Sequence, residues 1–324
     1  MQALDETSQR FDGQSHPTYT VACPASSFSC LLSHSSVVHS NKFIFANMSE
    51  SLIDFRSLID SYDFAPDGRE KFNTLFGLLD KAIGNSASHT SDANEAVANG
   101  IDEISNHDEP EGFLWTLWTL FIEISKRIPL DDPRVQSLVE ITQKLKVKKS
   151  ATVEVWGSKY SLWTDMPLFG AVMREAWNGT PNYDNSPEDA TTIAQWKSLN
   201  SFAARLLGSS VESWTNFALW ELRDGLEEPL ESQQAKDTHL IAASEWITHA
   251  GKVLYDEGRK GVPVDKDDEQ SLSTGSLLEG EASGFTEARW NFWKKKIQEL
   301  SAGAGDEAKK RAGKALEVVK SLEA

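Results

Sequence analysis

Two segments of the chain, 111–128 and 213–226, are apolar on more than one face when they are drawn as helices. The first carries Trp115, Trp118 and Phe121 within two turns. A helix of this kind is typically found at the centre of a bundle, because no face of it suits water. The two segments therefore predict an all-α fold, either a single helical bundle or an irregular helical array, with a core rich in tryptophan.

Other segments show the three- and four-residue spacing of apolar side chains that is typical of amphipathic helices. The best marked of them has an N-cap at Ser186, a capping-box acid at Asp189 and a stop at Gly208. Asp132 is the N-cap expected for another, since a first-turn proline follows it. The spacing predicts helices at about 67–83, 91–106, 135–145, 167–177, 193–206, 235–256 and 285–300, and a short strand at 153–156.

The composition divides the chain into three parts. Residues 1–47 are rich in serine and have no helical or strand period, so we expect a disordered extension upstream of a protein that starts at Met48. Residues 48–300 form the helical domain, in which the glycine-rich stretch at about 258–284 is predicted to be a mobile loop. Residues 301–324 combine a hinge with a basic amphipathic helix, which we expect either to dock on the acidic body or to bind a partner or a membrane.

The charge and the cysteines restrict the partners and the compartment. A net charge of −17 argues against a nucleic-acid partner, because nucleic acids are bound mainly through lysine and arginine. The longest apolar run, 113–122, is shorter than the roughly 20 residues of a membrane span. Cys23 and Cys30 both lie in the serine-rich stretch, so no disulfide staples the body, and we expect a cytoplasmic protein.

Zinc is the first metal that the residue types suggest. Cys23, Cys30, His34 and His39 are of the right kinds, but their spacing leaves no room for the helix of a Cys₂His₂ finger. We therefore predict no zinc site here.

Two further sets contain metal-binding residue types. On a helix, Glu245 and His249 lie roughly 40° apart and His239 roughly 80° further round, so the three side chains do not converge. Asp131 and Asp132 are similar to an aspartate-rich magnesium motif, but helix capping explains the pair better. We predict no metal site and no cofactor.

Recognised catalytic signatures are absent from the sequence. It contains no glycine-rich phosphate loop, no GxSxG elbow and no HExxH pair. The sequence therefore leaves open whether the protein is an enzyme.

The eleven tryptophans all lie between positions 115 and 293, and several stand next to charged residues. One interpretation is structural: the indoles fill the core, while each arginine stacks on an indole and pairs with a carboxylate. The alternative is a pocket lined by tryptophan in which arginine orients an anionic ligand. The candidate ligand-binding residues are Arg174, Trp220, Arg223, Arg289, Trp290 and Trp293.

Three blocks of sequence carry a family resemblance. They are LW at 162–163 with MPL at 166–168 and REAWN at 174–178, then ALWELR at 218–223, then GF at 284–285 followed by EARWNFWK at 287–294. With these blocks the chain resembles the fungal domain-of-unknown-function family numbered 3632, over roughly residues 110–300. The resemblance implies a fungal, cytoplasmic, helical protein without an assigned activity, and it offers no catalytic residue to transfer.

Two functions remain open. The first is a non-catalytic protein-interaction or scaffold role, since no acid, base or nucleophile set is recognisable. The alternative is a small-molecule binder or enzyme in which Arg223 or Arg289 holds the ligand inside a cavity of at least about 300 Å³. Saturation of these arginines by carboxylates such as Glu221 or Glu287 would exclude binding through them.

Overall fold

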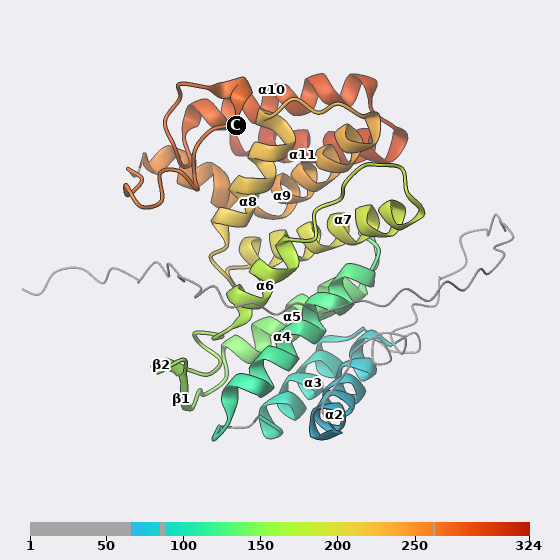
Figure 1. Ribbon diagram of the computed structural model, residues 1–324, viewed down its shortest axis with the longest axis vertical. Helices are drawn as coiled ribbons and strands as arrows, with labels where there is room; N and C mark the ends of the chain where they lie inside the picture. Colours follow the sequence, from blue (N-terminus) through green and yellow to red (C-terminus); the bar gives the residue numbers. More distant parts are fainter. Residues whose placement is uncertain (1–65, 85–88, 106, 262) are drawn as a thin grey trace, which may run out of the picture. The chain divides into compact units, whose positions relative to one another are not determined.

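The computed structural model of the protein describes residues 66–84, 89–105, 107–261 and 263–324. These residues all fall within one compact unit, Glu50–Ala324, and they are predominantly helical (Figure 1). The all-α prediction is confirmed. The predicted N-terminal extension and its cysteine–histidine set lie outside the described residues. No helix in the described part of the chain is both long and apolar enough to cross a membrane.

The helices and strands follow one another along the chain in this order. They are α2 (Pro66–Ile83), α3 (Ser91–Glu103), α4 (Pro110–Arg127), α5 (Arg134–Lys146), β1 (Thr152–Val155), β2 (Ser158–Ser161), α6 (Phe169–Trp177), α7 (Pro187–Gly208), α8 (Thr215–Leu222), the π-helical segment η1 (Arg223–Glu227), α9 (Gln233–Lys260), the 3₁₀ turn η2 (Ser276–Leu278), α10 (Glu287–Gly303) and α11 (Asp306–Leu322).

Helix α7 connects two groups of helices. It packs against α4 and α5 on one side and against α9 on the other (Figure 1). In the first group α3 packs on α2 and α5, and α4 packs on α6; in the second, α9 packs on α10 and α11, which also touch each other. The core runs through both groups, because buried side chains of all these helices form one continuous cluster.

Tryptophan fills much of this core, as the sequence predicts. Eight of the eleven tryptophans are buried. Trp118 stacks on Phe169 with 4.2 Å between the ring centroids. Trp177 lies 4.9 Å from Trp196 and 4.7 Å from Phe217, again between centroids. Aromatic pairs of this kind contribute about 0.5–1.5 kcal/mol each beyond the area that they bury.

The strand expected at 153–156 is the first of two. Strand β1 pairs antiparallel with β2, with Val153 opposite Tyr160. The turn consists of Trp156 and Gly157, both with positive φ (50° and 76°), which is the geometry of a tight hairpin turn. The second strand escaped the sequence analysis because it is short, polar and without a clean alternation of buried and exposed residues.

The capping prediction for α7 is confirmed in one part and wrong in another. The Ser186 hydroxyl accepts a hydrogen bond from the Asp189 amide at 3.3 Å. A capping box also requires the Asp189 carboxylate to accept a hydrogen bond from the Ser186 amide, and this bond is not formed. Instead the carboxylate accepts the amides of Tyr183 (3.1 Å) and Asn185 (3.2 Å), two residues with positive φ. The acid therefore stabilises the preceding turn.

At the start of α5 the Asp132 carboxylate accepts the amide of Arg134 at 2.9 Å and also pairs with the Arg134 guanidinium. Burial alone would raise the pKa of Asp132, but the bonds from Arg134 outweigh burial and lower it. Asp132 therefore stabilises the start of α5 from two positions before its first residue, Arg134, while the N-cap position expected for Asp132 is occupied by Pro133.

The C-terminal helix is docked. The apolar stripe of α11 is buried against α9 and α10, with Ala308, Ala312, Ala315 and Val319 all under a tenth exposed. The break before α11 falls at residues 304–305, since α10 extends to Gly303. Helix α9 likewise extends to Lys260, into the stretch predicted as loop.

Candidate functional site

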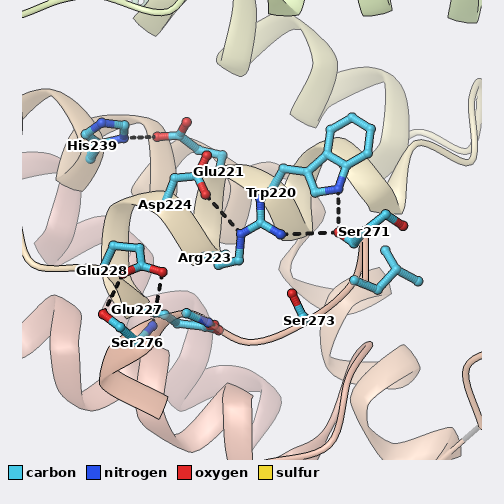
Figure 2. A network of polar contacts seen from close by, with 12 residues as sticks. Trp220, Glu221, Arg223, Asp224, Glu227, Glu228, His239, Ser271, Ser273 and Ser276 are labelled. Carbon is cyan, nitrogen blue, oxygen red and sulfur yellow. Dashed lines mark hydrogen bonds and ion pairs between the residues drawn. The ribbon is translucent and has the colours of Figure 1, made fainter. Parts of the chain in front are cut away.

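A change of helical pitch marks the region where the predicted ligand-binding residues gather. Helix α8 continues directly into η1, which has the wider turn of a π-helix. π-Helical turns inside α-helices occur frequently at functional sites. Figure 2 shows η1 with the segment 271–276, which runs alongside it.

Three of the predicted residues meet at the surface of this region. The Arg174 guanidinium lies over the Trp220 ring, 4.6 Å from its centroid. The Ser271 carbonyl oxygen accepts two hydrogen bonds, one from Trp220 Nε1 (2.9 Å) and one from Arg223 Nη1 (3.3 Å). Arg223 Nε donates to the neighbouring Asp224 carboxylate at 3.0 Å (Figure 2). These aromatic and guanidinium groups therefore tie α6 and α8 to the segment after α9.

Arg289, another predicted residue, is fully buried. Its Nε and Nη2 donate to the two carboxylate oxygens of Glu227 at 2.8 and 2.9 Å. Its Nη1 donates to the carbonyl oxygens of Leu272 and Gly284, both at 2.9 Å, and its Nη2 also donates to that of Ser273 at 3.2 Å. A guanidinium has five N–H groups. All five are used within the protein, so none is left for a ligand.

Glu227 is the centre of this buried network. Besides the arginine it accepts Trp293 Nε1 at 2.6 Å and the Gly275 amide at 2.8 Å. Trp290, the last of the predicted residues, points elsewhere: its Nε1 donates to Glu323 near the end of α11 at 3.1 Å. Of the six predicted residues, Arg174, Trp220 and Arg223 thus form a partly exposed group, Arg289 and Trp293 form a buried group around Glu227, and Trp290 stands apart.

Glu221 and Glu287, the carboxylates named as possible partners of the arginines, do not pair with them. Arg289 pairs with Glu227, which lies 62 positions earlier, and not with the nearby Glu287, which is exposed. Glu221 is buried but faces His239. Arg289 both lies over an indole, that of Trp293 with 5.6 Å to the ring centroid, and pairs with a carboxylate. Arg174 stacks on Trp220, and Arg223 pairs with Asp224.

Glu221 belongs to a second buried polar chain that the sequence analysis missed. Its Oε1 lies 2.9 Å from His239 Nδ1, and its Oε2 accepts Trp196 Nε1 at 3.2 Å. The Tyr183 hydroxyl lies 3.0 Å from His239 Nε2. These residues come from the loop before α7 and from α7, α8 and α9, so no short motif could have indicated the contacts.

Burial and neighbouring charges determine the protonation of His239 and Tyr183. Burial lowers the pKa of His239, but the negative charge of Glu221 and its hydrogen bond raise that pKa further than burial lowers it. Burial, followed by the charges of Glu221 and Asp189, raises the pKa of Tyr183, so the phenol keeps its proton. The set of Tyr183, His239 and Glu221 can hold a proton on His239, but both ring nitrogens are already in hydrogen bonds with the other two residues.

Neither a metal site nor a ligand groove is formed by the predicted residues within the described part of the chain. Among the described residues no group of three or more histidine, cysteine, aspartate and glutamate side chains is placed to hold a metal ion. An open groove of about 710 Å³ lies between α10 and α11, with Leu316, Val319 and Lys320 among its lining residues. None of the six predicted ligand-binding residues lines it.

Comparison with known proteins gives one match. The family model described as "Protein of unknown function (DUF3632)" matches residues 118–297, which is more than half of the chain. No curated protein and no solved structure matches the chain significantly.

Proposed function

The chain belongs to the DUF3632 family of proteins of unknown function, and on that premise we propose that it is a non-catalytic protein-interaction module. The observation that carries the proposal is an apolar surface at one end of the first helix group. Five large hydrophobic side chains in the described part are exposed, and four of them lie at this end. We call these four the end surface: Ile104 (38% exposed), Trp115 (41%), Val147 (83%) and Trp156 (58%).

Several contacts place the four residues of the end surface on neighbouring elements. Ile104 ends α3 and Val147 ends α5, two helices that pack together. The Trp156 amide, in the hairpin turn, donates to the Glu111 carboxylate at 2.7 Å. Trp115 follows Glu111 by one turn on the same face of α4. The two exposed indoles therefore lie on the same part of the surface.

The hairpin is also tied to the ends of α3 and α5. Trp163 Nε1 donates to the Asp102 carboxylate on α3 at 2.6 Å. The Trp163 amide donates to the hydroxyl of Ser150, which follows α5, at 2.9 Å. The elements that carry the end surface are thus held rigidly together, which reduces the entropy lost on binding.

Exposed tryptophan supports binding to a protein. Tryptophan is enriched among the few residues that carry most of the energy of an interface. Burying a whole aromatic side chain covers about 150–250 Å² of largely apolar surface, and roughly half of that is still exposed on Trp115 (41%) and Trp156 (58%). These two indoles with Ile104 and Val147 supply an apolar centre of the kind found in such interfaces. The cytoplasmic location expected from the sequence is part of this proposal.

Ligand binding through the second predicted group has less support. Arg289 would have to break an internal hydrogen bond to contact a ligand, because its N–H groups are all used. The small-molecule alternative is therefore restricted to the exposed group of Arg174, Trp220 and Arg223, for which it stays a prediction.

The test is quantitative capture from an extract of the source organism with the immobilised full chain. The variants are the double substitution Trp115→Ser with Trp156→Ser and, as the matched control, Leu277→Ser, which removes an apolar side chain of similar exposure (42%) outside the end surface. We expect a stoichiometric partner of the unaltered chain to fall at least tenfold with the double variant and to be retained by the control.

Both variants should remain folded, because substitutions of exposed side chains usually change stability by no more than about 0.5 kcal/mol. Circular dichroism checks this. A wild-type chain that captures no stoichiometric partner, or a double variant that captures it undiminished, would contradict the proposal.

A further inference from the structure

A second cluster of charged side chains lies where α5, α7, α9 and α11 approach one another, apart from the Glu227 network. Arg205 of α7 is half-buried in it. Its Nε points to the Ser201 hydroxyl and its Nη1 to the Gln136 side-chain oxygen, both at 3.4 Å. These two bonds are long and both acceptors are neutral. Within the described residues Arg205 forms no ion pair.

The surroundings of Arg205 disfavour its charge. Burial lowers its pKa, and the nearby Arg311 lowers it too, while Glu245 and Asp131 act in the opposite direction. A partly desolvated guanidinium without a direct counter-ion is unusual, because desolvating an unpaired charge is costly. A negatively charged group from outside would remove this cost.

Arg311 of α11 is the second guanidinium of the cluster and is only 5% exposed. Its Nη1 donates to Glu245 at 2.7 Å and its Nη2 to Asp131 at 3.0 Å. Its Nε is buried and makes no hydrogen bond within the described residues; an oxygen of Glu307 lies 3.6 Å away. This N–H group is a second unsatisfied donor next to Arg205.

Two exposed lysines form the rim of the cluster. Lys310 Nζ lies 3.7 Å and Lys314 Nζ 3.9 Å from the carboxylate of Asp131. With Arg205 and Arg311 the cluster holds four positive charges, against the two negative charges of Asp131 and Glu245.

A third acid near the cluster, Glu307, does not change this balance. Glu307 is paired with Lys197 at 3.0 Å, and the two charges cancel. A local excess of two positive charges therefore remains, on a chain whose net charge is −17. Such an excess attracts a dianion and is unfavourable without one.

We propose that this cluster is a binding site for a phosphate group carrying two negative charges, as on a small phosphorylated molecule. Nη2 of Arg205 makes no hydrogen bond within the described residues, and the two bonds of Nε and Nη1 are long, so the guanidinium keeps donors for phosphate oxygens. Lys310 and Lys314 supply further charge at the rim. Two charges on the ligand match the local excess, whereas a single carboxylate neutralises only half of it.

Asp131 has a distinct part in this site. It is more than half exposed (58% for its side chain) and accepts from Arg311 while it lies beside both lysines. Its carboxylate therefore competes with an incoming anion for the same cations. Neutralising it should strengthen phosphate binding, which a purely structural role for the cluster does not predict.

The experiment is calorimetric titration of the full chain with inorganic phosphate at constant ionic strength, with acetate as the monoanion control. Arg205→Gln removes the charge and breaks no ion pair seen in the described residues, so the variant should fold. The matched control is Arg259→Gln, an exposed arginine at the far end of α9. We expect Arg205→Gln to raise the Kd for phosphate at least tenfold and Arg259→Gln to leave it unchanged.

A third variant gives the opposite sign: Asp131→Asn should lower the Kd for phosphate at least threefold. Acetate should bind at least tenfold more weakly than phosphate to the unaltered chain. The absence of phosphate binding, equal Kd values for the Arg205 and Arg259 variants, or weaker binding by Asp131→Asn would each overturn the proposal. None of these results bears on the end surface, which lies on other residues.

Discussion

The substitution Arg289→Met tests whether the Glu227 network holds the second helix group together. Methionine is close to arginine in length and keeps the apolar contacts of its stem, but it removes all five N–H donors. The Glu227 carboxylate then keeps only Trp293 Nε1 and the Gly275 amide as partners, in a place where its side chain has no exposed surface.

The expected cost follows from this burial. Removing one partner of a buried ion pair typically destabilises a protein by about 3–5 kcal/mol, because the other charge is left without its partner. The carbonyl oxygens of Leu272, Ser273 and Gly284 also lose a donor, so the loss should lie above the lower end of this range. We therefore expect the free energy of unfolding to fall by about 4 kcal/mol.

Urea unfolding, followed by tryptophan fluorescence and circular dichroism, measures this loss. The double variant Arg289→Met with Glu227→Gln has no unpaired charge, so it should be less destabilised than the sum of the two single variants, by about 1–3 kcal/mol. Arg174→Met is the matched control, since this arginine is exposed and its stacking on Trp220 should be worth no more than about 1 kcal/mol. A loss below about 1 kcal/mol for Arg289→Met, or additive effects in the double variant, would refute the reasoning.

Two further predictions concern α9 and η1. Burial raises the pKa of Glu245, but the bonds from His249 and Ser201 and the charges of His249 and Arg311 together lower it to about 2, from 4.5. The ionised form thus contributes about 3 kcal/mol to the free energy of unfolding above pH 4.5, and this contribution is lost as the pH falls through 2. Glu245→Gln should therefore flatten the dependence of the unfolding free energy on pH between 4.5 and 2. Equal slopes for the variant and the unaltered protein would count against this assignment. Gly225→Ala should cost about 1–3 kcal/mol, because the added Cβ would lie 2.9 Å from that of His239. Gly313→Ala, where nothing lies within 4 Å, should instead be stabilising by up to about 1 kcal/mol, and a reversed order of the two melting temperatures would be evidence against this packing.

The helical architecture could be predicted because its signals are local. The 3.6-residue period and the caps act within one or two turns, so α7, with Ser186 as its N-cap, could be located to within a few residues. The tryptophan core follows from the same argument, since a helix that is apolar on several faces must be covered. The two exposed tryptophans, Trp115 and Trp156, and the partly buried Trp220 could not be recognised, because periodicity alone does not show which face lacks a neighbour.

The contacts of the six candidate residues could not be predicted from the sequence. All six arginines and tryptophans named from the sequence make aromatic or polar contacts, but the acids that they contact, Glu227, Asp224 and Glu323, were not among those considered. Glu227 and Arg289 are separated by 62 positions, and no local rule relates them. The π-helical segment that turns Glu227 inward has no sequence signature either, since it is formed where tertiary contacts favour a wider turn.

Counting donors separates the roles of arginines that look alike in the sequence. Arg289 and Arg205 both lie on helices and are both shielded from solvent, and neighbours alone would assign both to the core. Arg289 donates every N–H group to an acceptor of the protein, so its charge is fully compensated and its role is structural. Arg205 reaches only two neutral acceptors within the described residues, so the fold bears a desolvation cost that it does not recover. Replacing Arg205 with a neutral residue should therefore not destabilise the protein. Binding of an anionic ligand explains the charge at this position better than a contribution to stability does.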